Sequence, residues 1–238
     1  MAADWEGNFG DDYTERNLEI ADRSEFFKSL DPYNVRSALE VGCNVGTNME
    51  YLKEMGCEVA GVDLNAHALN IADKKGLEVY YGNANDLDIA SDEYDLVFTV
   101  GVLIHLNTPD LIRAMQEMRR VSRKFVMFAE YYGDDIEVEY HGERGALIKR
   151  DYGGIYRALF PEAQLVEKGF LGKEQGFDDV TYWIFYDVGD SASTYGIDEV
   201  AWESNDGSER SDVAFASTGT IGASRVGRRN RSCDWAYT

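Results

Sequence analysis

The chain has 238 residues, enough for one large α/β domain with its own core. Its net charge of −21 argues against a nucleic-acid partner, because neutralising phosphates requires clustered Lys and Arg, so we expect a small-molecule ligand. Cys43, Cys57 and Cys233 show neither metal-ligand spacing nor a disulfide framework, which favours a reduced, cytoplasmic protein without a metal site.

The N-terminal stretch MAADWEGNFGDD lacks a basic region and an apolar core, so we expect no signal peptide. The chain has no apolar run of the roughly 20 residues that span a bilayer, and we therefore expect no membrane partner. The sequence leaves the oligomeric state open.

Strands and helices alternate through the middle of the chain. Apolar patterning predicts strands at Ser37–Val41, Glu58–Asp63, Leu77–Tyr81, Tyr94–Val100, Lys124–Glu130, Gln164–Leu171 and Val180–Tyr186. Helices are predicted at Gly46–Met55, from an Asn65 cap to Lys75, from a Thr108 cap with Pro109 at the first helical position, and at Tyr152–Phe160. This order predicts a doubly wound, mostly parallel sheet whose last two strands form an antiparallel hairpin.

Two stretches fall outside this alternation. The segment Tyr131–Asp151 is too long for a plain strand-to-helix connection, and loops of this length are usually lids or binding loops. From about Gly189 the chain is rich in Ser, Gly, Asp and Arg without periodicity. We predict one domain over residues 1–188 and a disordered tail over residues 189–238.

The stretch LEVGCNVGTN at residues 39–48 places Glu40 at the end of a strand and then Gly42, Asn44 and Gly46 before a helix. A glycine turn that leads into a helix N-terminus favours an anionic or nucleotide ligand. A dinucleotide site requires a glycine where Thr47 stands, whereas an acid two residues before the first glycine fits S-adenosylmethionine-dependent methyltransferases. Asparagine tolerates the left-handed backbone conformation, so the turn can accept Asn44.

Polar residues follow the neighbouring strands in the same way. Asp63 ends the second strand, where its carboxylate can accept both ribose hydroxyls, and Asn83, Asn85 and Asp86 follow the third strand, where they can read an adenine edge. Gly101 directly follows the fourth strand. Because the carboxyl ends of parallel strands meet at one edge, these residues predict a binding site for S-adenosylmethionine. The alternative is a structural turn without a ligand.

The chain also resembles a known family, the pseudaminic acid biosynthesis-associated methylases within the class I methyltransferases. The resemblance spans about residues 5–187 and is carried by WEGNFGDDYTERN, LEVGCNVGTN, VFTVGVLIHLNTP, FAEYY, IKRDY and DDVTYWIF. It implies a seven-stranded Rossmann-like fold, S-adenosylmethionine as the methyl donor and a role in an acidic-sugar glycan pathway.

His105 follows the fourth strand and is the predicted catalytic residue, since histidine titrates near neutral pH and suits a general base. The alternative is a histidine that only fixes its loop. For the acceptor we predict contacts from aromatic and cationic residues, which are Tyr13, Tyr131, Tyr132, His141, Lys149 and Arg150. Lys149, Arg150 and Asp151 could instead pair internally and cap the next helix, and the N-terminal residues around Trp5 and Tyr13 form either a lid or a packing strap.

The sequence therefore predicts a methyltransferase that acts on a small polar acceptor, in our interpretation a hydroxyl of a sugar or sugar nucleotide. A non-catalytic S-adenosylmethionine-binding or assembly protein in such a pathway is the second hypothesis. An NAD-linked enzyme is disfavoured by the glycine spacing.

Overall fold

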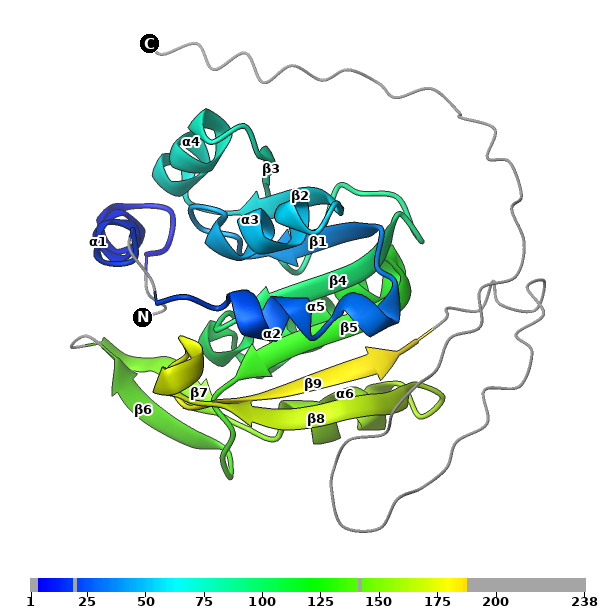
Figure 1. The fold of residues 1–238 in the computed structure, drawn as a ribbon. Coiled ribbons are helices and arrows are strands. Elements are labelled where there is room, and N and C mark those ends of the chain that lie inside the picture. Colours follow the sequence, from blue (N-terminus) through cyan, green and yellow to red (C-terminus); the bar gives the residue numbers. More distant parts are fainter. Residues whose placement is uncertain (1–3, 19–20, 141–142, 188–238) are drawn as a thin grey trace.

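The computed structural model describes residues 4–18, 21–140 and 143–187 (Figure 1). Its helices are α1 (Asn8–Arg16), α2 (Ser24–Lys28), α3 (Thr47–Glu54), α4 (Ala66–Lys74), α5 (Thr108–Val121) and α6 (Tyr152–Leu159). The strands are β1 (Ser37–Val41), β2 (Glu58–Asp63), β3 (Glu78–Tyr81), β4 (Tyr94–Val100), β5 (Ser122–Glu130), β6 (Ile136–Tyr140), β7 (Glu143–Lys149), β8 (Gln164–Leu171) and β9 (Val180–Tyr186). Short 3-10 turns lie at Asp31–Tyr33, Leu103–His105 and Lys173–Gln175.

Seven strands form one sheet in the order β3-β2-β1-β4-β5-β9-β8. The five strands from β3 to β5 are parallel, whereas β9 runs antiparallel to both β5 and β8. The prediction of a doubly wound, mostly parallel sheet with an antiparallel C-terminal hairpin is confirmed. The chain reverses its winding between β1 and β4, and ligands of such sheets bind at this switch point.

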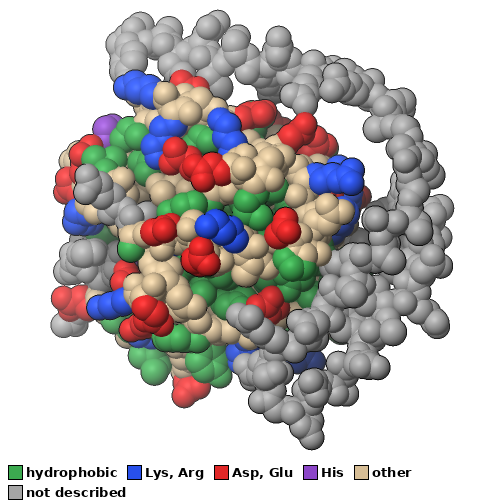
Figure 2. Space-filling view, viewed as in Figure 1, with side chains coloured by type: hydrophobic (Ala, Val, Ile, Leu, Met, Phe, Trp, Pro, Cys, Tyr) green, Lys and Arg blue, Asp and Glu red, His purple; other side chains and the backbone are tan. Residues whose placement is uncertain are grey.

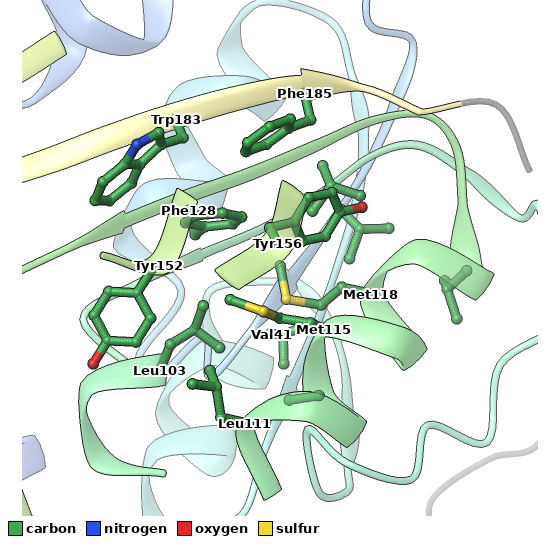
Figure 3. Close-up of a cluster of buried hydrophobic side chains, with 14 of the residues drawn as sticks. Val41, Leu103, Leu111, Met115, Met118, Phe128, Tyr152, Tyr156, Trp183 and Phe185 are labelled. Carbon is green, nitrogen blue, oxygen red and sulfur yellow. The ribbon is translucent and has the colours of Figure 1, made fainter. Parts of the chain in front are cut away.

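Each face of the sheet buries its own apolar cluster. On one face, Phe26 and Phe27 of α2 and Leu52 of α3 pack on alternate residues of β4, β5 and β9. On the other face, α5 and α6 cover β5 and β9, and Figure 3 shows Met115, Met118 and Tyr156 of these helices against aromatic side chains of the two strands. Burial on both faces explains why the central strands are almost continuously apolar.

Caps define where the helices begin. Asn65 caps α4 as predicted, because its side chain accepts a hydrogen bond from the Ala68 amide at 2.8 Å. The cap of α5 is Asn107, whose side chain accepts from the Asp110 amide at 3.0 Å, and the prediction of Thr108 as the cap was wrong by one residue. Asp151 caps α6 through the Gly154 amide.

The segment from residue 131 to residue 151 is not a plain loop. It contains the antiparallel hairpin β6–β7, with Ile136 opposite Lys149 and Val138 opposite Leu147. Apolar and acidic residues alternate in IEVEY at residues 136–140, which is a strand signal that the prediction of a loop did not include. The predicted tail at 189–238 lies outside the described residues, in which we find no helix with the length and apolar character needed to cross a bilayer.

Candidate functional site

A cavity of about 260 Å³ opens at the carboxyl ends of β1, β2 and β4. The arrowheads of β1, β4 and β5 in Figure 1 point toward the side where α1 lies, and residues of α1 complete the cavity wall. The lining also includes the turn after β1 and the 3-10 turn at Leu103–His105.

The glycine turn between β1 and α3 has the conformation that its sequence demands. Gly42, Asn44 and Gly46 all have positive φ, at 75°, 47° and 76°. A Cβ atom on Gly42 would lie 2.4 Å from a methyl group of Val102, so only glycine allows the turn to approach the loop after β4. Asn44 occupies the left-handed region as expected.

Asp63 joins this turn to the next one. One of its carboxylate oxygens accepts the Asn44 amide and the other accepts the Asn65 amide, each at 2.8 Å. Burial raises the pKa of Asp63, while the hydrogen bonds from these amides lower it. A carboxylate oxygen accepts more than one hydrogen bond, so the side chain can still accept from ligand hydroxyls.

Glu40 is fully buried at the base of the cavity, at 1% exposure. Its Oε1 accepts from Asn48 Nδ2 at 2.6 Å, whereas its Oε2 is buried with no hydrogen-bond partner among the described residues. Burial raises the pKa of Glu40 to about 8, against the lowering effects of Asn48 and of the charge on Arg23. Glu40 is also a lining residue of the cavity, so a ligand there could supply the missing hydrogen-bond donor.

Arg23 lies across Asn48 from Glu40, and sequence reasoning missed it. Its Nη1 donates to Asn48 Oδ1 at 3.0 Å, its Nε donates to the Gly176 carbonyl at 2.9 Å, and its guanidinium lies 4.4 Å from the centre of the Phe177 ring. These contacts come from segments far apart in the chain, so no local pattern marks Arg23 as a site residue.

The loop after β4 is held by Glu130, a second buried acid that sequence reasoning did not select. Its carboxylate accepts the amides of Val102, Leu103 and Ile104 at 3.1, 3.1 and 3.3 Å. Burial raises the pKa of Glu130 to about 8, while these backbone bonds lower it. An acid directly after the apolar run FVMFA at residues 125–129 is a signal that could have identified it.

His105 ends this loop and lines the cavity, with its ring centre 4.5 Å from that of Trp5. Most of the other predicted site residues also reach the lining, namely Tyr13, Glu40, Gly42, Asn44, Asp63, Asn83, Gly101 and Tyr131. Gly46 is not among the lining residues. A Cβ atom at this position would lie 2.3 Å from the Leu77 side chain, so the turn packs closely against Leu77.

Several predicted residues lie outside the lining. Asn85 donates to Asp110 at 2.9 Å, and the Asp86 amide donates to the Asn83 carbonyl. Arg150 is buried and donates to Asp135 at 2.7 Å and to the Leu106 carbonyl and Thr108 Oγ1 at 3.3 Å. Of the alternative for Lys149, Arg150 and Asp151, the structure shows the helix cap at Asp151, whereas Arg150 pairs with Asp135. Lys149 lies over the Tyr131 ring, Tyr132 is half exposed, and His141 lies outside the described residues.

The chemistry of the lining suits a polar organic ligand. Within the described ranges, no group of three His, Cys, Asp or Glu side chains is placed to hold a metal ion. Cys43 and Cys57 are free and buried, and burial raises the pKa of both thiols. The polar groups that line the cavity are carboxylates, amides, hydroxyls, the Arg23 guanidinium and the His105 imidazole.

Residues 38–124 match a protein-family model described as a methyltransferase domain. Over 107 residues, or 40% of this chain and 45% of the relative, the sequence is 33% identical to demethylmenaquinone methyltransferase of Bacillus velezensis. Over 87 residues, 33% of this chain and 38% of the relative, it is 33% identical to ubiquinone biosynthesis O-methyltransferase of Burkholderia orbicola. The chain thus spans less than half the length of these curated relatives.

Solved structures agree over a longer stretch. Magnesium protoporphyrin IX methyltransferase of Synechocystis, solved with bound SAH, superposes with a TM-score of 0.60 over 77% of this chain and 97% of its own, at 13% identity. A SAM-dependent methyltransferase of Aquifex aeolicus superposes with a TM-score of 0.57 over 76% of this chain and all of its own, at 17% identity. The chain therefore has the fold of S-adenosylmethionine-dependent methyltransferases, and its residues 38–124 match a methyltransferase domain.

Proposed function

We propose that the protein is an S-adenosylmethionine-dependent methyltransferase. The match of residues 38–124 to a methyltransferase domain supports this class, and the cavity lies where doubly wound sheets bind their ligands. The observation that carries the proposal is the array of Glu40, Asn48 and Arg23 on the cavity wall.

This array suits the amino-acid end of S-adenosylmethionine, which carries an ammonium group and a carboxylate on one carbon atom. The unpartnered Oε2 of Glu40 is the acceptor for the ammonium group. Arg23 has five N–H donors, and its hydrogen bonds to Asn48 and Gly176 leave others for the carboxylate. Recognition of both charges at once favours this cofactor over NAD.

The rest of the cofactor would follow the strand ends. Asp63 accepts the ribose hydroxyls, as its place at the end of β2 suggests, and Asn83 lines the cavity on the adenine side. The bound cofactor supplies an activated methyl group on a sulfonium. The chain contributes orientation, which in favourable cases supplies roughly 7–11 kcal/mol of the barrier.

For the acceptor, we keep the proposal of a hydroxyl group on a sugar or sugar nucleotide, which rests on the family resemblance. His105 lines the cavity beside Trp5 and Tyr13, whose rings suit a sugar face, and its imidazole would take the hydroxyl proton as a general base worth about 10²–10⁴-fold. The Burkholderia relative is named as an O-methyltransferase, which is compatible with an oxygen acceptor.

Titration calorimetry of the full chain with S-adenosylmethionine and with NAD tests the cofactor. We expect micromolar binding of the first and none of the second; binding of NAD alone would refute the proposal. Asp63→Ala should abolish binding, whereas His105→Ala should keep it and slow methyl transfer. Tight binding without transfer to any sugar nucleotide or cell extract would favour the non-catalytic binding protein.

A further inference from the structure

Helix α1 is attached to the domain in an unusual way. Its buried residues are Gly10 and Thr14, neither of which contributes a large apolar side chain. Segments with little buried apolar surface open locally at low free energy, even when the rest of the domain stays folded. Yet the segment from Trp5 to Asn17 lines the cavity with Trp5, Gly10, Tyr13, Thr14 and Asn17.

Two polar contacts of the N-terminal segment meet at Asn65, the N-cap of α4, and a third, exposed contact joins Glu15 of α1 to His67 of α4. The side-chain amide of Asn65 donates to Asp11 Oδ1 at 2.9 Å and to the Trp5 carbonyl at 3.2 Å. Its side-chain oxygen is already used as the cap of α4. Because Asn65 is 4% exposed, these bonds are shielded from water.

Asn65 also contacts the residue that we assign to the cofactor ribose. Its backbone amide donates to Asp63 Oδ1 at 2.8 Å. Asn65 therefore contacts both the Asp63 side chain and Asp11 of α1. Gly10 permits this close approach, since a Cβ atom there would lie 2.0 Å from the Trp5 carbonyl oxygen and 2.7 Å from Asn65 Nδ2.

The opposite side of Trp5 faces the loop after β4. Its ring lies 4.5 Å from His105, and Phe9 and Tyr13 hold it edge-on at 5.0 and 5.3 Å. When Asn65 holds the Trp5 carbonyl, the indole is therefore placed beside His105 at the cavity wall.

We propose that Asn65 is a positioning residue that couples cofactor binding at Asp63 to the docking of α1, and that docked α1 supplies Trp5 and Tyr13 as the acceptor-side wall. This inference rests on the proposed cofactor. A bound ribose restrains Asp63 and hence the Asn65 amide, and α1 then closes over the loaded cavity. The acceptor would accordingly bind after S-adenosylmethionine.

Hydrogen exchange on the full chain, without and with saturating S-adenosylhomocysteine, tests the coupling. In the wild type we expect the ligand to slow exchange of the α1 amides at least about fivefold. Asn65→Ser keeps the α4 cap and the backbone amide but removes the side-chain bonds to Asp11 and to the Trp5 carbonyl. The slowing should therefore vanish, and the ligand should dissociate several-fold faster. His67→Ala is the matched control, because it removes the exposed contact of α4 with Glu15 of α1, and an exposed contact contributes little, so both readouts should stay unchanged.

A second pair of variants acts from the α1 side, without touching α4. Asp11→Ala removes the acceptor of the Asn65 amide and should weaken the ligand-induced slowing, whereas Asp11→Asn keeps an acceptor oxygen and should restore it. The coupling would be overturned, and the proposed function kept, if the wild type binds S-adenosylhomocysteine but the α1 amides exchange at the same rate with and without it. Equal effects of all variants, the controls included, would overturn the coupling in the same way. If the wild type does not bind S-adenosylhomocysteine at all, the proposed function and the coupling both fail.

Discussion

At the scale of single residues, Asn48 connects the two charged side chains of the cavity. Its oxygen accepts from Arg23 and its nitrogen donates to Glu40, and the reverse orientation would face donor with donor and acceptor with acceptor. Asn48 is 7% exposed, so both bonds are sheltered. The Asn48 amide therefore lies between the Glu40 carboxyl group and the Arg23 guanidinium and is hydrogen-bonded to both.

Arg23→Met tests the carboxylate contact. Methionine retains much of the apolar stem but loses the N–H donors, so we expect the affinity for S-adenosylhomocysteine to fall by about 10–100-fold. The affinity for 5′-methylthioadenosine, which lacks the amino-acid end, should stay within about threefold of the wild type. Calorimetry with both ligands separates the cases; an equal loss for both would mean that Arg23 supports the cavity and does not read the carboxylate.

Glu40 should make cofactor affinity depend on pH. Burial raises its pKa to about 8 in the free protein, and a ligand ammonium group favours the ionised carboxylate. Binding should therefore strengthen from pH 6 to pH 8 and release protons, which calorimetry in buffers of different ionisation enthalpy detects. In Glu40→Gln the affinity should be weaker and flat over this range; a wild-type affinity that is flat as well would contradict the role of Glu40.

At the scale of elements, the loop after β4 is clamped from two sides. Glu130 at the end of β5 accepts three consecutive amides of this loop, and Arg150 after β7 donates to the carbonyl of Leu106. The clamp places His105 between them. Together with the burial of Leu103 and Ile104 in the core, these hydrogen bonds keep the turn at the cavity.

Glu130→Gln should loosen the clamp. The glutamine NH₂ group would face a backbone donor, and each buried donor left unpaired costs about 1–3 kcal/mol. We expect lower stability in urea and faster hydrogen exchange at residues 102–104. Glu117→Gln is the control, since Glu117 also accepts a backbone amide, that of Leu87, but lies outside the cavity lining; comparable exchange at residues 102–104 in both variants would exclude the clamp.

Arg150→Met separates an anchoring role from an acceptor-binding role. Loss of the bonds to Asp135, Leu106 and Thr108 should destabilise the protein by about 1–3 kcal/mol, with cofactor affinity nearly unchanged. Urea unfolding and calorimetry measure the two effects. Unchanged stability together with a lost response to acceptors would instead support the original prediction that Arg150 binds the substrate.

At the scale of the whole molecule, charge sets the response to pH. Acidic and basic side chains are interspersed on the face shown in Figure 2, while the net charge of −21 belongs to the full sequence. Two further acids, Glu40 and Glu130, are buried inside the fold, and burial raises the pKa of each from 4.5 to about 8. Between pH 4.5 and about pH 8 the folded state therefore binds more protons than the unfolded state.

Stability of the ligand-free protein should consequently fall as pH rises from 5 to 8. The contribution of these groups is fully present below the unfolded pKa and is lost as pH rises through the folded pKa, with a slope of up to roughly 1.4 kcal/mol per pH unit for each group. Urea unfolding at several pH values, at constant high salt to screen surface repulsion, measures this slope. The slope should be smaller in the double variant Glu40→Gln/Glu130→Gln. A slope identical to that of the wild type would mean that other groups cause the pH dependence.

The main sheet could be predicted because its strands are short apolar runs separated by residues with a definite local role. Val97 and Phe98 lie in a strand that is buried on both faces, and Asn65 is a cap that needs only its own helix. Helix α1 was not predicted, since NFGDDYTER has no apolar stripe of the usual kind and buries only Gly10 and Thr14. The hairpin β6–β7 was missed because its length suggested a loop.

The sequence by itself determined the glycine turn, Glu40, Asp63 and the succession of strands along the chain. These features depend on backbone conformation and on burial pattern, which neighbouring residues specify. Only the tertiary structure brought Arg23 and Asn48 to Glu40, placed Glu130 beneath the loop of His105 and set Trp5 against that histidine. Those contacts join residues from separate segments, and they form only when the sheet assembles and brings the carboxyl ends of its strands together.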